Sequence, residues 1–124
     1  MRHKYPINWF EIPARNFDRA VKFYRTILGK ELPVNDINGT KMAFFSTEPL
    51  EVSGVIIAGE GAEPSHKGIL IYLNGGEDLS TPLSKIEPAG GTIVQPKTKI
   101  SDEIGCYAIF IDSEGNRLAL HSPK

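Results

Sequence analysis

The stretch that decides the fold is NFDRAVKFYRTILG, residues 16–29. Its apolar side chains recur at the i, i+3, i+4, i+7 spacing of one helix face. They are Phe17, Ala20, Val21, Tyr24, Ile27 and Leu28. Asn16 precedes them as a residue type suited to capping a helix N-terminus, and Gly29 follows as a common stop. The stretch therefore predicts an amphipathic helix that begins after Asn16 and ends at Gly29.

Segments typical of β-strands surround this helix. Ile7–Ile12 precedes it, is rich in aromatic and β-branched residues, and closes at Pro13, which has no backbone N–H to donate. Three further strands are expected after the helix, at about residues 31–35, 41–46 and 52–58. Asn38-Gly39 predicts a hairpin turn between the first two of them. The first half of the chain therefore predicts the order βαβββ.

The second half repeats this order after a stretch with linker composition at residues 59–67. Strands are expected at residues 69–74, 92–96, 106–112 and 117–121, with a weaker helix that carries Pro82 between the first two. Four positions of the first helix and its end have residues of the same kind 62 positions later. Phe17, Val21, Tyr24 and Gly29 correspond to Leu79, Leu83, Ile86 and Gly91. We therefore predict one α+β domain, residues 1–124, built from two tandem βαβββ modules at about 5–59 and 67–122 that form curved sheets around a cleft.

Composition narrows the classes of function. The 124 residues, 40% of them hydrophobic and 23% charged, are typical of a single globular domain. The net charge of -1 argues against nucleic acid and anionic membranes as partners, and no apolar run approaches the roughly 20 residues of a membrane span. The single cysteine, Cys106, excludes an internal disulfide. The first residues show no export signal, so a cytoplasmic location is expected.

The repeated modules and several local motifs resemble the vicinal oxygen chelate superfamily, which includes glyoxalase I, bleomycin resistance proteins and extradiol dioxygenases. The motifs are the helix stretch just quoted, WFEIP at residues 9–13, Gly90-Gly91 and FIDSEGNR at residues 110–117. The resemblance covers nearly the whole chain and is nearest to the glyoxalase-like bacterial branch. Asp112 and Gly115 of the last motif predict a tight turn between the final two strands.

For the metal-dependent members, the resemblance implies a divalent ion held by His, Glu or Gln side chains on the first and last strands of each module. The corresponding positions fall near Trp9, Ile56 or Ile57, Leu70 and Ala119. None of these side chains can ligate a metal ion. We therefore expect no metal and no other cofactor. A weak divalent site formed by Glu11 and His121 stays open as an alternative.

Alternation along the strands selects the candidate site residues. Residues two apart face the same side, so a cleft-facing Trp9 brings Glu11 with it, and Tyr72 and His121 fall on the matching faces of the second module. Glu11 and His121 are candidate catalytic groups, as a carboxylate and an imidazole that can exchange protons. Trp9 and Tyr72 are candidate substrate-binding walls. The alternatives are an edge ion pair for Glu11, a structural role for His121, and core or dimer contacts for both aromatic residues.

These residues lead to two hypotheses about function. The first is a glyoxalase-like protein that binds or transforms a small organic molecule in the cleft, with a lyase or isomerase reaction open and a dioxygenase reaction not expected. The second is a non-catalytic protein that sequesters an aromatic or cationic compound, as bleomycin resistance proteins do. Because two incomplete sheets need partners to close a cleft, and the resemblance implies pairing within or between chains, a homodimer is expected.

Overall fold

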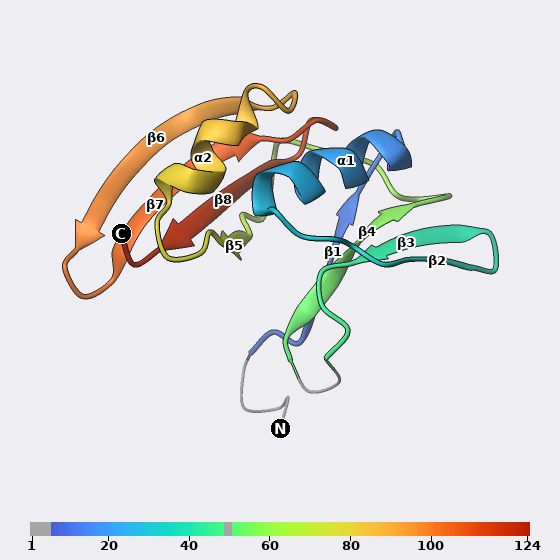
Figure 1. The fold of residues 1–124 in the computed structure, drawn as a ribbon. Coiled ribbons are helices and arrows are strands. Elements are labelled where there is room, and N and C mark those ends of the chain that lie inside the picture. Colours follow the sequence, from blue (N-terminus) through green and yellow to red (C-terminus); the bar gives the residue numbers. More distant parts are fainter. Residues whose placement is uncertain (1–5, 49–50) are drawn as a thin grey trace.

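The computed structural model describes residues 6–48 and 51–124, and Figure 1 shows its two halves in chain order. The expectation about export rests on the basic start of the chain, most of which lies outside this range. The first residue of the predicted first module, at about position 5, lies outside it as well. The first half contains β1 (Trp9–Pro13), α1 (Phe17–Leu28), β2 (Val34–Ile37), β3 (Thr40–Phe44) and β4 (Ser53–Ala58). The second half contains β5 (Tyr72–Asn74), α2 (Ser80–Ile86), β6 (Thr92–Ser101), β7 (Gly105–Ile111) and β8 (Arg117–Ser122).

Each half forms its own four-stranded sheet, and the two sheets have the same topology. The strand order is β1-β4-β3-β2 in the first sheet and β5-β8-β7-β6 in the second. In each sheet the first and last strands of the half pair in parallel, and the other neighbours are antiparallel. This confirms the predicted α+β class and the repeated βαβββ order.

Helix α1 has the ends that its sequence predicts. The Asn16 side chain accepts a hydrogen bond from the Arg19 backbone N–H at 3.1 Å, which caps the N-terminus. Gly29 takes the left-handed conformation, with φ 65°, and its N–H donates to the Arg25 carbonyl at 2.9 Å. Helix α2, which the sequence predicts to be the weaker, has 7 residues against 12 in α1 and has no side-chain cap.

We expect Gly29→Ala to lower the free energy of unfolding by about 1 kcal/mol, because a β-carbon is strained at positive φ. Space is not the cause, since the atom nearest to an added β-carbon is the Lys85 Nζ at 3.9 Å. Gly29→Asn is the matched control, because asparagine tolerates this conformation better. Urea denaturation of the three proteins measures the effect, and equal losses for both variants would contradict it.

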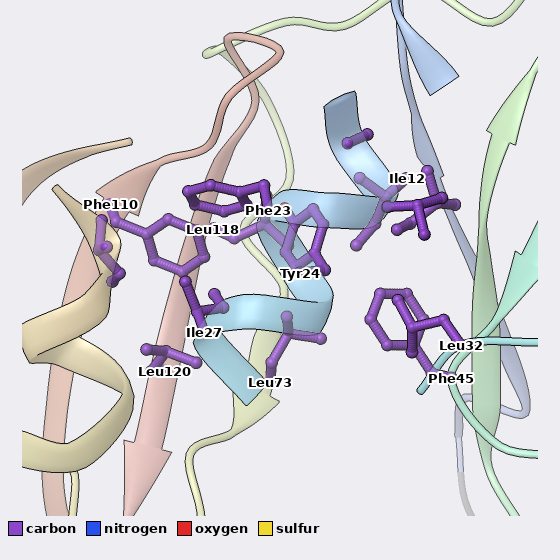
Figure 2. Close-up of a cluster of buried hydrophobic side chains, with 14 of the residues drawn as sticks. Ile12, Phe23, Tyr24, Ile27, Leu32, Phe45, Leu73, Phe110, Leu118 and Leu120 are labelled. Atoms are coloured by element: carbon purple, nitrogen blue, oxygen red, sulfur yellow. The ribbon is translucent and has the colours of Figure 1, made fainter. Parts of the chain in front are cut away.

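Helix α1 lies between the two sheets and packs on both (Figure 2). The Phe23 ring lies 6.1 Å from that of Phe110 on β7, and the Tyr24 ring lies 5.7 Å from that of Phe45, which follows β3. Ile12 on β1 and Leu120 on β8 belong to the same buried cluster. The inner faces of both sheets therefore cover one shared core, and their outer faces point away from it.

Several boundaries differ from those predicted. β1 and β2 begin later than expected, β2 ends at Ile37, and β5 covers only the last three residues of the predicted 69–74. β6 runs past Pro96 to Ser101, because the pairing register with β7 shifts between Gln95 and Thr98, where Pro96 needs no ladder hydrogen bond. Gly91 does not supply the left-handed stop expected from the repeat. Gly90 has the positive φ of 108°, and Gly91 packs tightly against the Ile111 carbonyl.

The turn between β7 and β8 ties the two halves together through Glu114. Its side chain is fully buried and accepts hydrogen bonds from the backbone N–H groups of Arg15 and Asn16 at 2.9 and 2.7 Å. It also accepts from the Arg19 guanidinium, at 2.7 Å from Nε. Gly115 has φ 96°, so the predicted tight turn is confirmed. The start of α1 is thus anchored on the last module.

Two neighbouring side chains of this turn extend the link. The Asp112 carboxylate accepts a 2.6 Å hydrogen bond from the Tyr24 hydroxyl of α1. Asn116 donates to the Pro13 carbonyl at 2.7 Å and accepts from the Ser65 N–H at 3.1 Å. Burial, together with the nearby Asp112 carboxylate, raises the pKa of Tyr24 well above its ordinary value. These contacts hold β1, α1 and the 59–67 segment against the β7–β8 turn.

Candidate functional site

The outer face of the first sheet carries an aromatic hollow, here called the Trp9 hollow. Trp9 and Phe44 meet edge to face with ring centroids 6.2 Å apart. Around them a depression of about 290 Å³ is lined by residues of all four strands, of the segment before β2 and of the segment between β3 and β4. Trp9 is 39% exposed although it is the largest side chain of its strand. Phe44 is half-buried, so the pair presents mainly the Trp9 ring, which suits contact with another molecule.

The outer face of the second sheet carries a comparable feature, here called the His121 hollow. It is lined by Tyr72, Ile100, Ile104, His121 and their neighbours, and Tyr107 lies beside Tyr72 with ring centroids 6.5 Å apart. Tyr72 is 53% exposed. The side chains alternate as predicted, since Leu73 and Leu120 are buried in the core while Tyr72 and His121 face outward.

One hydrogen bond orients the His121 ring. Its Nε2 lies 2.6 Å from the Ile104 carbonyl oxygen, which can only accept, so we assign the proton to Nε2. In the neutral ring Nδ1 is then a hydrogen-bond acceptor. His121 and Tyr107 are paired directly across β8 and β7, which places both side chains on the outer face. The imidazole is therefore held in one orientation beside two tyrosine rings.

Glu11 occupies a third hollow, at the seam between the halves. Residues of the 59–67 segment, Ile69, Ile71 and Arg117 line it together with Glu11. Arg117 donates to the Gly68 carbonyl at 3.2 Å. Within residues 6–48 and 51–124, none of the ion pairs closer than 4.0 Å includes Glu11, so the edge ion pair considered for it is not formed there.

In a single chain the four predicted site residues are not brought together. Tyr72 and His121 share a hollow, but Trp9 and Glu11 line two others. The prediction of which strand face each side chain occupies agrees with the observed alternation of burial. It gave no information on how the two outer faces lie relative to each other.

Metal-ligating side chains do not gather on these faces. Over the part of the chain that the structure describes, no group of three or more His, Cys, Asp or Glu side chains could hold an ion. At positions that the resemblance assigns to metal ligands, Ile56 is buried in the core, whereas Ile57 pairs with Pro13, and Ala119 pairs with Tyr72. The residues present do not fit the metal that the fold implies.

Phe44 and Tyr107 were missed by sequence reasoning. Both lie on strands predicted correctly, and Phe44 is paired with Val55, which itself pairs with Glu11. Period-2 alternation carried across the sheet from Glu11 would have placed Phe44 on the outer face. The missing information was the pairing register between β3 and β4. The predicted Asn38-Gly39 turn joins β2 to β3 and does not set that register.

Neither helix in the described part of the chain is long and apolar enough to cross a bilayer.

Comparison with known proteins gives one family. Residues 6–120 match the family model described as Glyoxalase/Bleomycin resistance protein/Dioxygenase superfamily. A glyoxylase-like domain-containing protein from Didymella fabae is 30% identical over 120 residues, which are 92% of this chain and 91% of that protein.

Two solved structures share the fold at low identity. Glyoxalase I from Zea mays has a TM-score of 0.66 and 18% identity, and the match covers 94% of this chain and 44% of that one. An antibiotic binding protein from Streptomyces has a TM-score of 0.62 and 19% identity, with 97% of each chain covered. One of these neighbours is named as an enzyme and the other as a binding protein.

Proposed function

Because the chain belongs to the glyoxalase/bleomycin resistance protein/dioxygenase superfamily, we propose that it binds a small organic molecule in a cleft between its modules, without a metal ion. The observation that carries the proposal is the aromatic pair on each outer face, in which exposed Trp9 lies beside half-buried Phe44 and exposed Tyr72 beside half-buried Tyr107. Aromatic walls with a few polar groups are typical of small-molecule sites. The name of the Streptomyces neighbour, an antibiotic binding protein, supports a binding role.

A homodimer supplies the closed cleft that one chain lacks. The two outer faces point away from the shared core, so the Trp9 and His121 hollows of one chain do not face each other. Both hollows expose apolar side chains: Trp9 is 39% exposed in the first, and Tyr72, Ile100 and Ile104 are 53%, 47% and 54% exposed in the second. Apposing the first module of one chain with the second module of another covers both faces in a twofold symmetric way.

The set of available donor side chains supports the proposal that no metal ion is needed. The positions that the family resemblance assigns to metal ligands carry Trp9, Ile56 or Ile57, Leu70 and Ala119, and stable sites use three or four protein ligands. Glu11 and His121 lie in separate hollows of the chain. Even if a dimer brought them together, two donors would leave the shell incomplete.

A screen of aromatic compounds tests the proposal. We expect dimers in sedimentation equilibrium and, within a panel of neutral monocyclic and bicyclic compounds that includes phenylbutanol, saturable binders that raise the melting temperature. EDTA is expected to leave their binding unchanged, and elemental analysis is expected to find less than one equivalent of metal. The expected effect of replacing both Trp9 and Tyr72 with alanine is loss of these melting shifts. Shifts that survive in the double variant, or one tightly held metal per chain, would contradict the proposal.

A second candidate function, catalysis at the same cleft, is favoured by the geometry of His121. With Nε2–H donated to the Ile104 carbonyl, Nδ1 is available to accept a proton from a bound molecule. Glu11 is the candidate partner group from the other module. Turnover of a bound compound that Glu11→Gln and His121→Gln each abolish while binding persists would support catalysis. Recovery of that compound unchanged would support sequestration.

A further inference from the structure

We infer that the Trp9 hollow binds the cationic end of its ligand, an alkylammonium or guanidinium group. This inference rests on the proposed function and names the chemical class that one half of the cleft selects. Three independent features of the hollow point to it: its charge, its aromatic walls, and a buried hydroxyl group without a partner.

The charge of the hollow is negative. Glu48 and Glu51 line it, and among the lining residues that the structure describes there is no lysine, arginine or histidine. Over the same described residues, neither carboxylate forms an ion pair closer than 4.0 Å. The Ser46 hydroxyl donates to Glu51 at 2.9 Å and accepts from the Glu48 N–H at 3.2 Å. Lys30 lines a neighbouring hollow together with Glu51, but these two described residues form no ion pair closer than 4.0 Å. Two carboxylates without an ion pair in one depression attract a cation.

The aromatic walls suit an organic cation. Trp9 and Phe44 lie edge to face, so their rings offer faces of different orientation to a bound group. Ring faces carry negative electrostatic potential and attract ammonium and guanidinium groups, most strongly in the case of tryptophan. A metal ion would need several oxygen donors in close contact, whereas this hollow has a volume of about 290 Å³ and is partly apolar.

Ser53 supplies the third feature. It is only 5% exposed, lines the hollow, and is paired with Trp9 across β4 and β1. Its Oγ is buried and has no hydrogen-bond partner within the described residues. Buried hydroxyl groups are normally satisfied, so an unpartnered one in a hollow indicates a bound group that completes it. An N–H of an ammonium or guanidinium group is such a partner.

Trp9 is the only tryptophan of the chain, so its fluorescence reports on this hollow alone. The probes are phenylbutylammonium, phenylbutanol and phenylbutyrate, which share one aromatic body and differ in the charge of one end. We expect the ammonium compound to change Trp9 emission saturably and to bind about tenfold more tightly than the alcohol. The carboxylate is expected to bind more weakly than either.

Three variants locate the effect. We expect Glu51→Gln to remove most of the tenfold preference for the ammonium compound while binding of phenylbutanol stays unchanged. Ser53→Ala is expected to weaken ammonium binding severalfold. Glu60→Gln, an exposed carboxylate outside the hollow, is the matched control and is expected to behave as wild type.

The outcomes separate this inference from the proposed function. Equal affinity for the ammonium compound and the alcohol would overturn the inference and leave the proposed function standing. Preference for the ammonium compound that persists in Glu51→Gln and in a Glu48→Gln, Glu51→Gln double variant would also overturn it. No binding of any aromatic compound in the fluorescence and melting assays would overturn both.

Discussion

Glu114→Ala is expected to lower the free energy of unfolding by about 3 kcal/mol, the largest loss we expect from replacing one turn residue. The variant removes the acceptor for the Arg15 and Asn16 N–H groups and leaves both without their partner at the start of α1. It also frees the Arg19 guanidinium, but this side chain is 52% exposed and can be hydrated, so the loss of that ion pair adds little. Urea denaturation near neutral pH measures the change.

The same carboxylate makes stability depend on pH. Burial raises the pKa of Glu114, but the hydrogen bonds from Arg19, Asn16 and Ser113 outweigh burial and hold it below its ordinary value of 4.5. The folded state therefore binds fewer protons than the unfolded state just below pH 4.5, so the stabilisation is fully present above that pH. It is lost as the pH falls through the lowered pKa of the folded state.

Glu114→Gln isolates this effect, because glutamine keeps the shape but does not titrate. We expect the difference in unfolding free energy between wild type and Glu114→Gln to be constant above about pH 5 and to shrink below pH 4.5. Glu60→Ala, on an exposed turn, is the control and is expected to change stability by less than about 0.5 kcal/mol. A difference between wild type and Glu114→Gln that stays constant to pH 3 would show that Glu114 is not the titrating group.

The elements of the fold were readable from local patterns because each pattern reflects local physics. The spacing of Phe17, Tyr24 and Ile27 describes a helix face, and Asn16 and Gly29 satisfy its ends through contacts within one turn. The repeat predicted that both halves have the same order of elements. The predicted boundaries of β5 and β6 were wrong because pairing with a neighbouring strand decides where each strand begins and ends. β5 pairs with β8, which is distant in sequence, and β6 pairs with β7 through shifts of register.

The role of Glu114 was not readable because the partners that anchor α1, Arg15, Asn16 and Arg19, lie 95 to 99 residues away. A glutamate in a turn between strands looks like a solvated residue, and nothing in its neighbourhood signals burial. For the site, strand alternation predicted the faces of Trp9, Glu11, Tyr72 and His121. Whether these faces meet depends on the position of α1 between the sheets, which is set by packing of Phe23 and Tyr24 and not by any local pattern.

The position of α1 between the two sheets leads to the second large effect that we expect, which is a change in ligand affinity in dimers of two different variants. If each cleft combines the first module of one chain with the second module of its partner, damage to either half impairs both clefts of a symmetric dimer. We expect Phe44→Ala homodimers and Tyr72→Ala homodimers each to bind phenylbutylammonium about tenfold more weakly than wild type.

A heterodimer of the two variants is expected to regain one cleft. One cleft then combines two undamaged halves, and the other combines the two damaged halves, so calorimetry should find wild-type affinity at one site per dimer. Coexpression with two different affinity tags and sequential purification yields this heterodimer. If the two halves instead served one chain, every chain of the heterodimer would carry one damaged half and no tight site would appear. If the Trp9 hollow bound the probe alone, Tyr72→Ala homodimers would bind as wild type. Recovery at half the sites is thus the result that only a cleft shared between chains produces.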